Sequence, residues 1–148
     1  MSGQAVTLLL VEDSPQDLEL TLRELLASKL SAGVKVLRDG AEALDFLFCE
    51  GAYAERPPEL GPRAVFLDLK LPKVDGLEVL RRIKADPRTQ ATPVVVLSSS
   101  REERDVAAAY AAGANSYVVK PVNFDQFSQM VRQVAAYWLR TNHPPEQE

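Results

Sequence analysis

The chain has 148 residues, a net charge of −4 and 46% hydrophobic residues, the profile of one globular domain of ordinary size. The negative charge disfavours a nucleic-acid surface, and no apolar stretch is long enough to span a bilayer. A single cysteine, Cys49, excludes an internal disulfide and a multi-cysteine zinc site. Since the N-terminus also lacks a signal-peptide pattern, we expect a cytoplasmic protein in which Cys49 is a small packed thiol of a helix.

The predicted elements alternate between strands and helices in chain order. Apolar runs predict strands at residues 6–11, 34–37, 64–67, 93–100 and 116–119, and helical periodicity predicts helices at about 14–26, 41–50, 75–85, 101–112 and 124–140. The Pro- and Gly-rich stretch 51–62 predicts a loop, and residues 141–148 a frayed tail. We therefore expect one domain over 1–148 with its core at about 6–140.

The first helix carries a clear start signal. Ser14 is suited to the N-cap, and Pro15 to the first helical position, where its missing N–H costs nothing. Its apolar face is predicted to hold Leu18, Leu22, Leu25 and Leu26.

The predicted strands are continuously apolar rather than alternating. That pattern is typical of parallel strands whose sheet is covered on both faces by crossover helices. Five βα units predict a doubly wound α/β domain, in which a site is expected at the carboxyl ends of the strands.

Chemically active side chains follow four of these strands. Glu12 and Asp13 follow the first, Asp68 the third, Ser98 ends the fourth, and Lys120 follows the fifth. Carboxylates gathered at one edge repel one another, and Mg²⁺ relieves that repulsion with few protein ligands and several waters. We therefore predict that Asp68 is a nucleophile for phosphoryl transfer, with Lys120, Ser98 and Mg²⁺ neutralising the transferring oxygens.

The same residues are open to other interpretations. Each residue alone has a structural role open to it, such as an acid that favours a helix N-terminus. An enzyme of the haloacid dehalogenase type needs a second acid two residues after the nucleophile, where this chain has Lys70. A flavin carrier needs a phosphate-cradling loop after the first strand, where "VEDSPQD" is acidic.

The stretches "LLLVEDSPQDLELT", "VFLDLKLPKVDGLEVLRRIK", "PVVVLSSS" and "AGANSYVVKP" resemble the receiver domain of bacterial two-component response regulators. The resemblance implies a flavodoxin-like (βα)5 fold with strand order 2-1-3-4-5 and a phosphoacceptor rather than an enzyme. It implies that Asp68 accepts the phosphoryl group, that Ser98 and Tyr117 form the switch, and that the Lys120–Pro121 bond is cis. It implies further that Mg²⁺ is held by the following groups: the Glu12, Asp13 and Asp68 carboxylates and the Lys70 carbonyl.

No effector domain follows residue 140, which indicates a stand-alone receiver. The loop at 51–62, together with "VLSSS", "KPVNFDQFSQMV" and "YWL", resembles the small response regulators of phytochrome-type sensor kinases. The expected partner is thus a sensor histidine kinase of two-component signalling, with light as a candidate signal. A homodimer through the last strand and helices is also expected, because the stretch Tyr137–Leu139 adds apolar surface. The alternative is a pseudo-receiver, an interaction module that is not phosphorylated.

Two further positions concern the lifetime of the phosphorylated state. Lys70 and Ser100 lie two residues beyond Asp68 and Ser98. The resemblance implies that these positions border the water that hydrolyses the acyl phosphate. A long Lys70 side chain there predicts a phosphorylated state that is not unusually short-lived.

Overall fold

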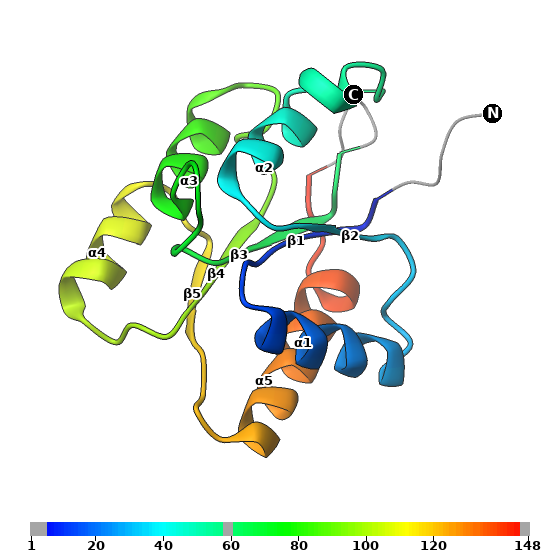
Figure 1. Ribbon diagram of the computed structural model, residues 1–148, viewed down its shortest axis with the longest axis vertical. Helices are drawn as coiled ribbons and strands as arrows, with labels where there is room; N and C mark the ends of the chain where they lie inside the picture. Colours follow the sequence, from blue (N-terminus) through cyan, green and yellow to red (C-terminus); the bar gives the residue numbers. More distant parts are fainter. Residues whose placement is uncertain (1–5, 58–60, 146–148) are drawn as a thin grey trace.

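The computed structural model describes residues 6–57 and 61–145, in which five parallel strands form one sheet in the order β2-β1-β3-β4-β5 (Figure 1). The strands are β1 (Leu8–Val11), β2 (Val34–Leu37), β3 (Ala64–Leu67), β4 (Val94–Ser98) and β5 (Ser116–Val119). The helices are α1 (Pro15–Ala27), α2 (Gly40–Leu47), α3 (Gly76–Ala85), α4 (Glu103–Ala111) and α5 (Phe124–Ala136), with short turns η1 (Gly51–Tyr53) and η2 (Tyr137–Thr141). The doubly wound fold and strand order predicted from the sequence are confirmed.

Helices cover both faces of the sheet, with α1 and α5 on one side and α2, α3 and α4 on the other (Figure 1). Neighbouring residues of a strand point to opposite faces. Val65 accordingly packs with α2, α3 and α4, whereas Phe66 packs with α1 and α5. Both faces of each central strand are therefore buried, which explains why these strands are continuously apolar. Among the helices of the described residues, none has the length and apolar character needed to cross a bilayer.

The predicted start of α1 is confirmed. Ser14 Oγ accepts the Asp17 N–H at 3.2 Å, and Pro15 occupies the first helical position. The predicted apolar face is wrong at Leu26, which is 68% exposed. Leu18, Thr21 and Leu25 face the core, and one residue turns a helix by about 100°, so Leu26 points away from the sheet.

The helix α2 ends earlier than predicted, at Leu47 rather than at residue 50. The prediction that Cys49 lies in a helix is therefore wrong. Cys49 has a φ of 55°, the left-handed conformation that commonly ends a helix. The Arg56 guanidinium lies 4.2 Å from the Phe46 ring centroid, and its Nε donates to the Phe46 carbonyl at 2.8 Å. The predicted loop at 51–62 is therefore anchored on α2, although its residues 58–60 lie outside the described part of the chain.

The predicted helix at 124–140 is helical along its whole length, although its α-helical part α5 ends at Ala136 and residues 137–141 have π geometry. A single π turn follows α5, in which the Asn142 N–H donates to the Tyr137 carbonyl at 2.6 Å. Trp138 and Leu139 pack against the core that α1 and α5 cover, whereas Tyr137 is 48% exposed. Part of the predicted tail is also held, because Arg63 Nη2 donates to the Asn142 carbonyl at 2.5 Å. Residues 146–148 of that tail lie outside the described residues.

Candidate functional site

The carboxyl edge of the sheet gathers a buried lysine and three carboxylates. Lys120 Nζ donates to Glu12 Oε1 at 2.8 Å, to Asp68 Oδ2 at 3.0 Å and to Asp17 Oδ2 at 3.0 Å. An ammonium has three donors, so all of them are used. The Lys120 side chain is only 7% exposed, and it reaches from the edge strand β5 past β4 to acids at the ends of β3 and β1. The predicted proximity of Glu12, Asp68 and Lys120 is confirmed.

Asp17 belongs to this cluster, although the sequence analysis did not assign it to the site. It lies in the first turn of α1, directly after the loop that follows β1. The first turn of such a helix stands over the same sheet edge as the preceding strand end. The available signal is an acid in the first helical turn after a strand end, which indicates a helix start as readily as a site.

The electrostatics of the cluster favour an additional cation. Burial, followed by the adjacent Asp68 carboxyl, raises the pKa of Glu12 to about 7, although Lys120 lowers it. Burial lowers the pKa of Lys120, but the hydrogen bond to Glu12 and the charge of Asp68 outweigh it, so this pKa lies above its ordinary value. One ammonium thus faces three carboxylates, which leaves an excess of negative charge at the edge of the sheet.

The residues predicted to bind a metal are only partly gathered. Asp13 is exposed and is not among the partners of Lys120. Within residues 6–57 and 61–145, no three His, Cys, Asp or Glu side chains are already grouped as metal ligands. The chemistry of the donors nevertheless fits Mg²⁺, because this ion accepts one or two carboxylates and retains several waters. Burial and the adjacent Asp68 carboxyl raise the pKa of Glu12, so a bound cation would favour its ionised form.

The backbone around Asp68 is tightly fixed. The Asp68 N–H donates to the Val11 carbonyl at 3.0 Å, and Asp68 Oδ1 accepts the Lys70 N–H at 3.0 Å. Gly76 begins α3 directly against this turn, and a Cβ on Gly76 would lie 2.2 Å from the Asp68 carbonyl oxygen. Only glycine fits there, so the sequence "DLKLPKVDG" folds back on its own aspartate and holds it in place.

The two predicted switch residues meet at a third residue. Ser98 is buried, and its Oγ accepts the Ser100 N–H at 3.1 Å. The Tyr117 hydroxyl donates to the Ser100 carbonyl at 3.0 Å. Within the described residues, no contact uses the Ser98 hydroxyl proton, which leaves that proton available as a donor.

The prediction of a cis Lys120–Pro121 bond is wrong, because the described residues contain no cis peptide bond. A trans bond is intrinsically favoured before proline by about 0.5–1 kcal/mol. The Lys120 side chain reaches all three carboxylates with the trans bond, so the observed contacts do not require the cis form.

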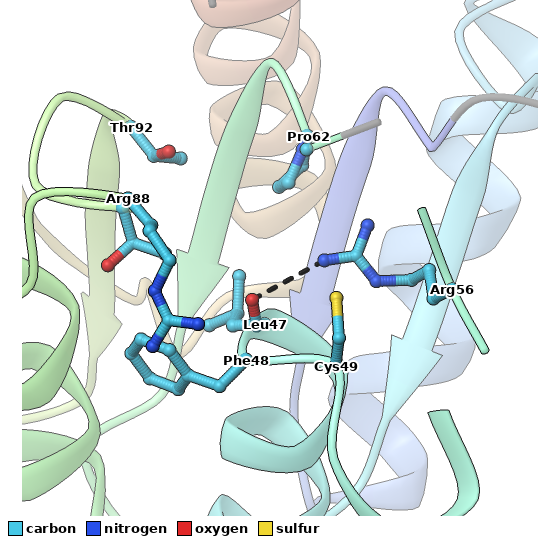
Figure 2. Close-up of a pocket in the computed structure, with 9 residues that line it drawn as sticks. Leu47, Phe48, Cys49, Arg56, Pro62, Arg88 and Thr92 are labelled. Atoms are coloured by element: carbon cyan, nitrogen blue, oxygen red, sulfur yellow. Dashed lines mark hydrogen bonds between the residues drawn. The ribbon is translucent and has the colours of Figure 1, made fainter. Parts of the chain in front are cut away.

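A separate cavity of about 320 Å³ lies near the opposite, amino edge of the sheet (Figure 2). Pro62 precedes β3 and Thr92 precedes β4, and both line it. Cys49 and Arg56 also line it, and Arg88 lies over the Phe48 ring at 5.0 Å from its centroid. This cavity is therefore separate from the acidic cluster around Lys120.

The chain belongs to a known family. The sequence profile of the response regulator receiver domain matches residues 8–132, and the chain is therefore a member of that family.

Relatives agree along almost the whole chain. The response regulator Rcp1 of Synechocystis sp. (strain PCC 6803) is 41% identical over 140 residues, which are 95% of this chain and 93% of Rcp1. The probable methanogenesis regulatory protein FilR2 of Methanothrix harundinacea is 41% identical over 139 residues, which are 93% of this chain and 86% of FilR2.

Solved structures of response regulators have the same fold as this chain over almost their whole length. The Mn(2+)-bound form of Rcp1 has a TM-score of 0.87 at 40% identity, covering 95% of this chain and 99% of that one. The phosphorylated cyanobacterial phytochrome response regulator RcpA has a TM-score of 0.86 at 40% identity, covering 96% and 99%. The predicted resemblance to small phytochrome response regulators is confirmed.

Proposed function

We propose that this chain is a single-domain response regulator in which Asp68 accepts a phosphoryl group from a sensor histidine kinase. The observation that carries the proposal is the contact of 3.0 Å between Asp68 Oδ2 and Nζ of the buried Lys120. In the transfer, an Asp68 carboxylate oxygen forms a bond to phosphorus. The bond from phosphorus to the kinase histidine nitrogen breaks, and that nitrogen keeps the electron pair.

The other residues have distinct proposed roles. Lys120 neutralises charge on the transferring oxygens, and Ser98 donates its hydroxyl proton to one of them. Bound Mg²⁺ would supply further positive charge to the same oxygens. Its proposed ligands are the Glu12, Asp13 and Asp68 carboxylates and the Lys70 carbonyl. Support comes from the excess negative charge at Glu12 and from the Mn(2+)-bound form of the relative Rcp1.

The proposed output is a protein-interaction surface rather than catalysis. Movement of Ser98 toward the phosphoryl group would change its contact with Ser100, which Tyr117 also contacts. We propose a phytochrome-type kinase as the partner, supported by the similarity to RcpA. The partners are then proteins and not nucleic acid or membrane, and we place the protein in the cytoplasm, which its single cysteine supports.

The proposed homodimer rests on less surface than the sequence indicated. Trp138 and Leu139 pack against the core, whereas Tyr110 and Tyr137 are exposed, as are Val122 and Phe124 near the start of α5. We propose that these tyrosines, on α4 and after α5, contribute to a contact between two copies. Light scattering with and without a phosphodonor tests this, and a monomer in both conditions contradicts it.

The deciding experiment is incubation with acetyl phosphate, with and without Mg²⁺, followed by intact mass measurement. We expect one added phosphoryl group that requires Mg²⁺ and is absent in Asp68→Asn. Asp45→Asn, a carboxylate of α2 outside the cluster, is the matched control and should be modified like the wild type. If neither acetyl phosphate nor beryllofluoride forms an adduct, the proposed function is wrong and the chain is a pseudo-receiver.

A further inference from the structure

Ser100 connects three parts of the molecule through separate atoms. Its N–H donates to Ser98 Oγ, and its carbonyl accepts from the Tyr117 hydroxyl. Its own hydroxyl donates to the Asp105 carboxylate, which makes this a charge-assisted hydrogen bond. The same Ser100 Oγ accepts the Glu102 N–H at 3.2 Å. A residue two positions from Ser98 is thus bonded to β4, β5 and the start of α4.

The start of α4 depends on these contacts more than the starts of the other helices do. Each of α1, α2, α3 and α5 has an N-cap side chain that accepts a backbone N–H of its first turn. The N-cap residue of α4 is Glu102, whose side chain makes no such bond. Instead, Ser100 Oγ accepts the N–H of the N-cap residue Glu102, and Asp105 in the first turn accepts the Ser100 hydroxyl proton, so both contacts tie the start of α4 to the β4–α4 loop.

The rest of α4 is held by little buried surface. Ala109 is its only buried residue among those described, and the helix packs mainly on β5 and α3. An alanine side chain buries little apolar area, so packing favours one position of α4 only weakly. The polar contacts at its first turn therefore have a large share in deciding where this helix lies.

We propose that Asp105 is a positioning residue, and that the Ser100–Asp105 pair is the link by which a change at Ser98 reaches α4. The proposal rests on the proposed function, since phosphorylation of Asp68 is what moves Ser98. When the Ser98 hydroxyl turns to the phosphoryl oxygens, its contact with the Ser100 N–H changes. Ser100 then moves, and Asp105 carries that movement into the first turn of α4.

The test compares amide hydrogen exchange of α4 with and without beryllofluoride, a stable mimic of the phosphoryl group. In the wild type, we expect beryllofluoride to change exchange at residues 103–108. In Asp105→Ala we expect the change in exchange rate caused by beryllofluoride to be about fivefold smaller. A factor of about five corresponds to the loss of one hydrogen bond of about 1 kcal/mol. Asp105→Asn should restore part of the beryllofluoride effect, because the amide oxygen still accepts from Ser100.

Glu103→Ala is the matched control, because it removes an exposed acid from the same turn and should leave the beryllofluoride effect unchanged. A merely structural role would make α4 of Asp105→Ala exchange faster in both states while the difference persists, and that result overturns the inference. If Asp105→Ala fails to bind beryllofluoride while Glu103→Ala binds it, Asp105 acts on the acceptor site itself and the inference is also wrong. Absence of any adduct on the wild type instead refutes the proposed function.

Discussion

Replacing Glu12 with glutamine tests whether the acidic cluster is short of positive charge. Burial and the neighbouring Asp68 raise the pKa of Glu12 from its ordinary 4.5 to about 7. The folded protein therefore binds a proton on Glu12 more tightly than the unfolded chain does. Ionisation of Glu12 then reduces stability as the pH rises from 4.5 to 7, and the reduction is complete above pH 7.

The expected size of the effect follows from this rise in pKa. Each pKa unit corresponds to about 1.4 kcal/mol, so the ionised Glu12 lowers the free energy of unfolding by up to about 3 kcal/mol. Glutamine resembles the neutral acid, and its amide oxygen still accepts from Lys120, but its amide nitrogen cannot accept the Ser14 N–H that Glu12 Oε2 accepts at 3.1 Å, which offsets about 1 kcal/mol. We therefore expect Glu12→Gln to be more stable than the wild type by about 2 kcal/mol at pH 8 without metal, and not to be more stable at pH 5.

The measurement is urea unfolding of both proteins in EDTA at pH 5 and pH 8. Glu19→Gln, an exposed acid on α1, is the control and should change stability little at either pH. Addition of Mg²⁺ should stabilise the wild type more than Glu12→Gln. A Glu12→Gln protein that is less stable than the wild type at pH 8 would show that the attraction of Lys120 outweighs burial and repulsion, which would refute the reasoning.

Three further predictions concern other positions. Gly76→Ala should lower the free energy of unfolding by about 2 kcal/mol or more and slow phosphorylation, because its Cβ would lie 2.2 Å from the Asp68 carbonyl oxygen; urea unfolding and intact mass measure the two effects. Lys84 Nζ donates to the carbonyls of Gln90 and Thr92 and to Asn115 Oδ1, so Lys84→Ala should cost about 1–3 kcal/mol by the same unfolding assay. An unchanged stability would mean that water replaces the ammonium. Lys70→Ala should lose its phosphoryl group faster than the wild type in a mass time course, and an equal rate contradicts the predicted role of Lys70.

Patterns within short stretches of the sequence predicted most of the architecture. Strand and helix periods are local properties, and the ranges predicted for β2, β3 and β5 agree with the structure. The helix after β1 was recognised from the Ser14 cap and Pro15 for the same reason. The end of α2 was misplaced because it depends on packing, since Arg56 stacks on Phe46 after this helix. The change from α to π geometry after Ala136 was not predicted either.

The sequence by itself determined that Glu12, Asp68, Ser98 and Lys120 meet at one edge, because parallel strands bring their carboxyl ends together whatever the details of packing. Only the tertiary structure decided which atoms touch. Lys120 bonds Asp17 across 103 positions of the chain, and Ser100 joins Ser98, Tyr117 and Asp105. The length of a side chain and the number of its hydrogen-bond donors decide which distant residues it contacts in the folded protein. The periodicity of hydrophobic residues in the sequence does not predict those contacts.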